Sequence, residues 1–98
     1  MSMLHVVNKS PYERDSLDTC VGYCKDGDAV LLIEDGVYAA MKAGTAAAKL
    51  NGLDVSVLGP DLAARGIAED KLLDGVKVVD YAGFVDLTEA KDKVQSWL

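Results

Sequence analysis

The chain has 98 residues, of which 50% are hydrophobic and 27% are charged, and its formal net charge is −6. This length allows a single domain, residues 1–98, with one modest core. The basic residues are scattered, no apolar run approaches the roughly 20 residues of a membrane span, and no signal peptide is visible. We therefore expect no direct nucleic-acid binding and no membrane association. Two cysteines are too few for a disulfide scaffold, which favours the cytoplasm.

Four short apolar segments predict β-strands. In chain order they are residues 3–7, 29–33, 55–58 and 76–79. The second and third are continuous apolar runs flanked by Gly or Asp, which is typical of strands buried on both faces. Helical stretches lie between them. The pattern predicts an α/β domain of three layers, with a mainly parallel sheet of about four strands, as in flavodoxin-like and Rossmann-like folds.

The first helix has two possible starts. Ser10, Pro11 and Glu13 form a capping-box pattern, with Ser at the cap, Pro in the first helical position and Glu three residues after the cap. Asp15 and Ser16 offer a competing start one turn later. The residues alone leave both starts open.

The second helical region follows Asp35 and Gly36, where Asp35 is expected to accept free amides of the first turn. Residues 39–50 are rich in Ala and predict a helix that ends at Asn51 and Gly52. Gly44 lies inside this stretch and can bend or split it.

Two more helices complete the prediction. Residues 60–65 predict a short helix stopped by Gly66, and Asp80 is expected to cap a last helix at residues 81–87, which can continue through residues 88–94. We interpret Asp61 and Asp80 as helix caps and not as general acids.

Both cysteines lie in the first helix. Leu17, Cys20, Val21 and Cys24 are spaced as one apolar stripe of an amphipathic helix, so the residues alone favour two thiols packed in the core. The alternative is a nucleophilic or sulfur-carrying thiol, which requires exposure and a stabilised thiolate. The spacing matches neither a dithiol redox motif nor a zinc motif, and we expect no metal and no cofactor.

The single histidine, His5, lies inside the first strand and is interpreted as a packed residue, not as a catalytic base. A Cys–His pair with Cys20 is conceivable in space but has no signal in the sequence. No phosphate-binding glycine motif is present. The residues by themselves indicate an α/β domain without a complete active site, which is typical of a subunit that works within a larger assembly.

Several stretches, read together, resemble the DsrH/TusB family. Residues 3–11 (MLHVVNKSP) resemble its MLHxxxxSP opening, and residues 32–40 (LIEDGVYAA) resemble its LLxxDGVxAA segment. Residues 61–66 (DLAARG) and 79–88 (VDYAGFVDLT) match two later motifs, and Trp97 matches a Trp near the end of the chain. Each motif alone is weak, but five in the right order over nearly the whole chain are specific.

The resemblance implies a DsrE-like fold and a small subunit of a cytoplasmic sulfur-relay complex. Such subunits assemble with DsrE/TusD-type and DsrF/TusC-type subunits into a heterohexamer containing two of each. The complex passes persulfide sulfur to a carrier protein of the DsrC/TusE type. One branch of the family delivers sulfur to the wobble 2-thiouridine of tRNA, and the other serves dissimilatory sulfur oxidation. The principal sulfur-carrying cysteine belongs to the DsrE/TusD-type subunit.

DsrH-type members carry a cysteine in the first helix, and Cys20 occupies that place. The resemblance therefore makes Cys20 a candidate persulfide carrier of a sulfurtransferase complex and favours sulfur oxidation. Two alternatives stay open: a TusB-type subunit in tRNA thiolation, and a purely structural subunit. An autonomous sulfurtransferase is the least supported. We expect Cys20 to be partly accessible and Cys24 inert, and we expect residues 39–50 and 81–87 to contact the sister subunits.

Overall fold

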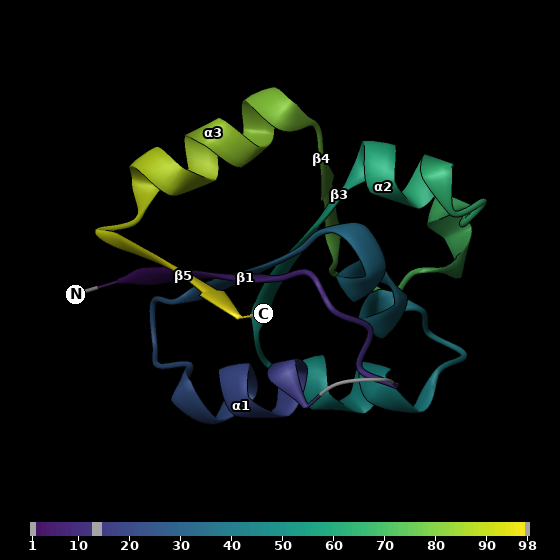
Figure 1. Cartoon of the computed structure of the whole chain (residues 1–98), viewed down its shortest axis with the longest axis horizontal. Helices are drawn as coiled ribbons and strands as arrows, with labels where there is room; N and C mark the ends of the chain where they lie inside the picture. The colour runs from purple at the N-terminus through teal and green to yellow at the C-terminus, as the bar shows by residue number, and fades with distance from the viewer. Residues whose placement is uncertain (1, 13–14, 98) are drawn as a thin grey trace.

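A parallel β-sheet forms the middle layer of the computed structural model, which describes residues 2–12 and 15–97 (Figure 1). The sheet has five strands in the order β4-β3-β2-β1-β5, and each neighbouring pair is parallel. The strands are β1 Met3–Val7, β2 Ala29–Leu32, β3 Asp54–Leu58, β4 Lys77–Val79 and β5 Lys93–Trp97. The expected parallel α/β fold is confirmed.

Helical segments cover both faces of the sheet. On one side lie α1 (Ser16–Tyr23) and two 3-10 segments, η1 (Glu34–Ala40) and η2 (Thr45–Leu50), while α3 (Tyr81–Ala90) lies on the opposite side (Figure 1). Helix α2 (Gly59–Ala64) follows β3 directly and contacts η1, and η3 (Glu69–Lys71) is a single turn. Within residues 2–12 and 15–97, no helix is both long enough and apolar enough to cross a membrane.

The core is divided between the two faces because successive side chains of a strand point in opposite directions. Beneath α1, the buried cluster includes Val7, Val30 and Val57 from three strands, together with Leu17 and Cys20 from the helix. The cluster beneath α3 is smaller. Its buried members are Leu4, Val6, Ala29 and Leu31, and the side chains packed on them include Phe84 and Leu87.

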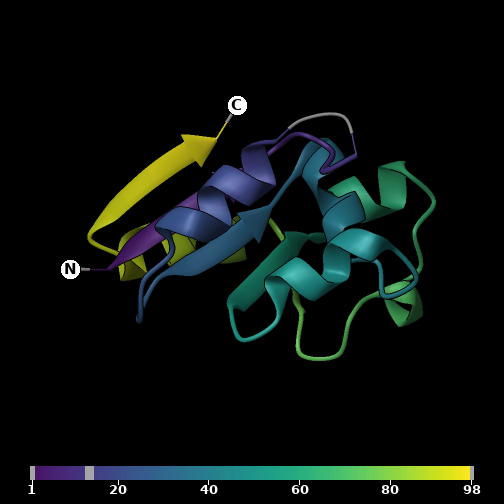
Figure 2. The ribbon, with the colours of Figure 1, turned by 90° about the horizontal axis from the view of Figure 1, so that it is seen from below.

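The last strand departs from the sequence prediction. The final helix continues past residue 87 as far as Ala90 but not through residues 91–94; the chain then returns as β5 along the outer side of β1, where Val7 pairs with Trp97 (Figure 2). Helix periodicity is a local signal, whereas β5 is stabilised by a backbone ladder to residues about ninety positions away. The prediction therefore missed the fifth strand.

The first helix uses the later of its two expected starts. Helix α1 begins at Ser16, with Asp15 in the N-cap position. Ser10 instead stabilises a turn, because its Oγ accepts a hydrogen bond from the Tyr12 amide at 3.2 Å. Glu13, the last residue of the expected capping box, lies outside the described residues.

The Ala-rich stretch is not one α-helix. Gly44 divides it into η1 and η2, and a Cβ atom at this position would collide with the Tyr12 hydroxyl. Part of the stretch is buried in the protein's own core, namely Ala39, Ala40, Ala46, Ala47 and Leu50. Other residues of the stretch are exposed, namely Lys42, Ala43, Thr45, Ala48 and Lys49. The expectation that residues 39–50 contact another subunit is therefore wrong for the buried side chains and stays a prediction for the exposed ones.

The three acidic residues interpreted as caps behave differently. The Asp80 carboxylate accepts the Gly83 amide at 2.8 Å and caps α3 as expected. Asp35 is not a cap, since its Oδ1 accepts a hydrogen bond from the Arg65 side chain at 3.0 Å. Asp61 accepts the amide of Glu34 at 2.7 Å and so ties α2 to η1, where Glu34 has a φ of 49°.

Candidate functional site

Three side chains with metal-binding or nucleophilic chemistry meet between β1 and α1. A ring nitrogen of His5 and the Sγ atoms of Cys20 and Cys24 all lie within 4.8 Å of one another. His5 is at the centre of β1, between strands β2 and β5. The two cysteines are one helical turn apart, which places them on the same face of α1. The Cys–His proximity that the sequence left open is therefore present.

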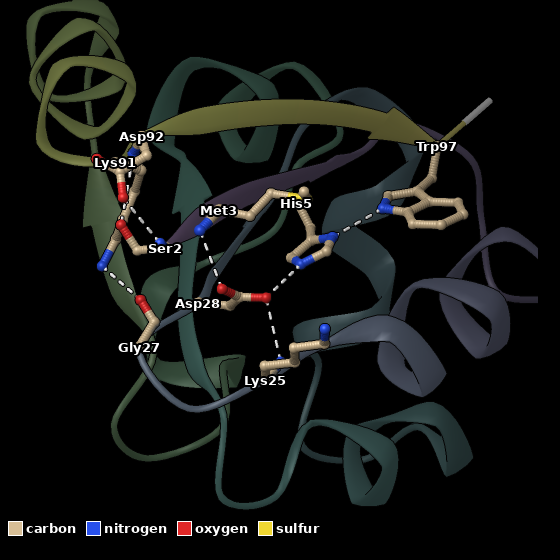
Figure 3. Close-up of polar contacts among 9 residues, drawn as sticks. All are labelled: Ser2, Met3, His5, Lys25, Gly27, Asp28, Lys91, Asp92 and Trp97. Atoms are coloured by element: carbon tan, nitrogen blue, oxygen red, sulfur yellow. Dashed lines mark hydrogen bonds and ion pairs between the residues drawn. The ribbon is translucent and has the colours of Figure 1, made fainter.

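His5 is almost fully buried, with 1% of its surface exposed, and both ring nitrogens have partners (Figure 3). The Trp97 indole Nε1–H donates to His5 Nδ1 at 3.0 Å, and His5 Nε2 lies 2.9 Å from Asp28 Oδ2. An indole N–H can only donate, so Nδ1 must be the accepting nitrogen. The ring proton consequently lies on Nε2 and is donated to Asp28.

Asp28 is held in place by the backbone as well as by His5. Its Oδ1 accepts the Met3 amide at 2.9 Å, and its Oδ2 accepts the Lys25 amide at 3.1 Å (Figure 3). The hydrogen bond from His5, supported by these two amides, lowers the pKa of the Asp28 carboxyl below its ordinary value. Asp28 is therefore a fixed carboxylate that sets the orientation and tautomer of the imidazole.

The two thiols differ in a way that reverses the sequence expectation. Cys20 is fully buried, at 0% exposure, whereas Cys24 is partly exposed. Burial, followed by the neighbouring Cys24, raises the pKa of the Cys20 thiol to about 12, and burial also raises the pKa of Cys24. Cys20 faces the core from the middle of α1, while Cys24 lies at the C-cap, where the backbone becomes extended. The prediction that Cys20 would be the accessible thiol is wrong.

A cavity of about 420 Å³ opens beside this cluster. Its lining includes His5, Asp28, Tyr23, Lys25, Lys93 and Trp97. The Trp97 ring stacks on His5 with centroids 6.0 Å apart, and the Tyr23 ring lies 5.4 Å from Trp97. The cavity is lined by residues of the paired strands β1 and β5, and because His5 is part of the lining it gives solvent a path to the imidazole.

Sequence reasoning found Cys20 and His5 but missed the groups that organise them. Asp28 stands between a helix and a strand without a motif, and Trp97 was noticed only through the family resemblance. Ninety-two positions separate His5 from Trp97, so no spacing rule could pair them. A prediction that residues 93–97 form a strand beside β1 would have placed the Trp97 indole next to His5.

Comparison with known proteins supports a family assignment. The family model described as "DsrH like protein" matches residues 9–94. Protein TusB from Pectobacterium parmentieri is 38% identical over 97 residues, which cover 97% of this chain and 100% of that protein. Protein TusB from Enterobacter sp. (strain 638) is 35% identical with the same coverage, and that from Yersinia pestis (strain Pestoides F) is 34% identical.

Solved structures support the fold. The YchN protein from E. coli superposes with a TM-score of 0.81 at 20% identity, covering 98% of each chain. Tm0979 from Thermotoga maritima superposes with a TM-score of 0.67 at 23% identity, covering 92% of this chain and 93% of that one. The family model spans most of the chain and the curated relatives align over their full length, so this chain belongs to the DsrH/TusB family.

Proposed function

We propose that this chain is a TusB-type subunit of a sulfur-relay complex that serves synthesis of the wobble 2-thiouridine of tRNA. The observation that carries the proposal is the full-length similarity, at 33–38% identity, to proteins named TusB in several bacteria. The presence of Cys20 led us to prefer dissimilatory sulfur oxidation from the sequence. The names of the curated relatives favour the tRNA-thiolation alternative.

The proposed partners are TusC-type and TusD-type subunits, in a heterohexamer with two of each, and a TusE-type carrier that receives persulfide sulfur in the cytoplasm. A surface available for such contacts lies around α3 and β4. Tyr81 is 61% exposed and Val85 is 54% exposed, one helical turn apart on α3, and Val78 on β4 is exposed as well. Exposed large apolar side chains on one helix of a small domain are typical of a subunit interface.

Co-expression with TusC-type and TusD-type subunits tests the assembly. We expect a stable complex by size-exclusion chromatography with light scattering, and restored 2-thiouridine in a strain lacking its own TusB, measured by mass spectrometry of tRNA. A complex that forms only with proteins of sulfur oxidation, without restoring tRNA thiolation, would support the DsrH-type branch instead. A chain that binds no sister subunit would overturn the relay proposal.

Cys20 remains our candidate persulfide carrier within this function. To gain sulfur, its thiolate attacks the outer sulfur of a donor persulfide and the donor thiol departs as its thiolate. A pKa of about 12 opposes this step in the closed structure, so the proposal requires α1 to open or a partner to reshape the site. The side-chain hydrogen bond between Cys20 and Cys24 supports a chemical role because it places a second sulfur beside the thiol.

Single substitutions separate a carrier from a structural subunit. We expect Cys20→Ser to assemble normally but to lower tRNA thiolation, whereas Cys24→Ser should thiolate tRNA at the normal level. Full thiolation by assembled Cys20→Ser would leave the purely structural subunit as the correct interpretation.

A further inference from the structure

We propose that His5, Cys20 and Cys24 form a binding site for a thiophilic metal ion, and that Zn²⁺ is the ion that fits best. The proposal goes beyond sulfur relay and does not depend on it. Thiolate and imidazole are the ligands that zinc prefers in proteins, and the three ligand atoms already lie within 4.8 Å of one another. They come from the interior of β1, from α1 and from the C-cap of α1, so two regular elements position the site.

The distances require only a small contraction. Tetrahedral zinc with Zn–S bonds of about 2.3 Å and Zn–N bonds of about 2.0 Å places its ligand atoms roughly 3.5–3.8 Å apart. Closing the present cluster to these separations shortens each distance between ligand atoms by at most about 1.0–1.3 Å. Side-chain rotation of Cys24, at the end of α1, can supply part of this movement without disturbing the sheet.

The polar contacts of His5 select its ligand atom. A metal-binding histidine almost always donates its other ring N–H to a carboxylate or a carbonyl, which fixes the tautomer and makes the ligand more basic. Asp28 accepts the Nε2–H of His5 at 2.9 Å and is itself held by two backbone amides. Nδ1 is therefore the ring nitrogen that carries no proton, and the structure assigns it as the metal ligand.

Trp97 occupies the lone pair that the ion would use. Its indole N–H donates to Nδ1 at 3.0 Å, so binding must replace this hydrogen bond with a metal bond. Trp97 is at the end of the edge strand β5 and lines the cavity of about 420 Å³, which leaves space for the ring to turn aside. The same cavity gives an ion a path to His5 and space for an external fourth ligand.

The charges also fit a divalent ion. Two thiols lose their protons on binding, and the two thiolates then balance Zn²⁺, so no net charge is added to a largely buried place. Asp28 stays negative and continues to polarise the imidazole. A metal-bound Cys20 cannot hold a persulfide, so occupation of this site and sulfur transfer through Cys20 exclude one another.

Titration of the full chain with Co²⁺, after reduction and removal of metal, tests the site. We expect one ion per chain, with sulfur-to-cobalt charge-transfer absorption and the visible bands of tetrahedral cobalt, both lost when Zn²⁺ is added. Zn²⁺ should also raise the thermal midpoint of unfolding, because the ion binds the folded chain preferentially. Absence of a one-to-one thiolate–cobalt spectrum would overturn the proposal.

Variants identify the ligands and separate them from structural neighbours. Cys20→Ser, Cys24→Ser and His5→Gln should each weaken Co²⁺ binding by more than tenfold, and Asp28→Asn should weaken it by about 10–100-fold. Asp18→Asn is the matched control, since this exposed carboxylate lies on α1 and pairs with Lys49. Binding that is unchanged in His5→Gln, in a variant shown to be folded by circular dichroism, would exclude this site.

Trp97→Phe gives the sharpest test because the two interpretations predict opposite signs. If the indole blocks the Nδ1 lone pair, its removal should tighten Co²⁺ binding, even though the chain becomes less stable. If Trp97 only supports the local fold, the same change should weaken binding together with stability. Weaker binding in folded Trp97→Phe would therefore contradict the assignment of Nδ1.

Discussion

The two faces of the sheet are built differently. On the α1 face, Leu17 and Cys20 are buried and a polar network centred on His5 is closed by Asp28 and Trp97. On the opposite face, none of the residues of α3 is buried, although Phe84 and Leu87 pack on the sheet. One face is thus a finished core, while the opposite face keeps apolar side chains of α3 exposed. We therefore expect folding stability to depend mainly on the α1 face and the proposed assembly to depend on the α3 face.

The largest expected loss of unfolding free energy comes from a cavity made in the core on the α1 face. Leu17→Ala should lower the free energy of unfolding by about 2–5 kcal/mol, because a buried leucine is removed from a packed cluster. Val85→Ala on α3 should stay within about 0.5 kcal/mol of the wild type. Urea denaturation measures both. Equal losses would show that the isolated chain depends on the two faces alike.

The second largest loss of unfolding free energy should come from removing the Asp28 carboxylate. Asp28→Ala leaves the Met3 and Lys25 amides and the His5 Nε2–H without their acceptor, which should cost about 1–3 kcal/mol at neutral pH.

The same carboxylate makes a pH prediction. The folded pKa of Asp28 lies below its unfolded value, so its contribution is present above the unfolded value of about 4 and is lost as pH falls through the folded value. Wild-type stability should therefore decline below about pH 4, and Asp28→Asn should decline less steeply. Urea denaturation at a series of pH values measures this. If the unfolding free energies of wild type and Asp28→Asn fell in parallel with decreasing pH, Asp28 would not be the stabilising carboxylate.

A charge on the open face should affect assembly but not folding. Val85→Asp should weaken binding to the sister subunits by at least about tenfold, or 1.4 kcal/mol, while the unfolding free energy of the isolated chain barely changes. Glu89→Gln, at another exposed position of α3, is the control. Calorimetric titration with the sister subunits gives the affinities. Normal binding by Val85→Asp would move the interface away from this part of α3.

The smallest effects concern the acidic residues at the helix starts. Asp80→Ala should cost about 1 kcal/mol because it removes the cap that accepts the Gly83 amide. Asp35→Ala should cost less than about 1 kcal/mol, because its pair with Arg65 lies in a solvent-exposed position. Thermal unfolding compares the two. A larger loss at Asp35 would show that this ion pair organises η1.

Local patterns predicted much of the fold. The apolar segments ending at Val7, Leu58 and Val79 were found as strands with nearly correct bounds, and the Asp80 cap was found from its position before a helix. These features depend on periodicity and on side chains within a few residues, which a sequence displays directly. The motif order was also sufficient to suggest the family that the comparisons then showed.

The site depended on contacts that no local pattern carries. Its polar network joins residues 5, 28 and 97, and its thiols come from a fourth segment. Buried and accessible thiols on one helix face also look alike in sequence, so the greater exposure of Cys24 could not be foreseen from its spacing.

The sequence by itself thus determined a parallel α/β domain, its main strands and its family, because alternation, capping and motif order are local properties. Only the tertiary structure decided that residues 93–97 form a strand, that Cys20 is sealed in the core and that His5 meets both thiols. Each of these results follows from the pairing of β5 with β1 and the packing of α1 on the sheet. Both arrangements are stabilised by apolar burial and by backbone hydrogen bonds between segments far apart in the sequence.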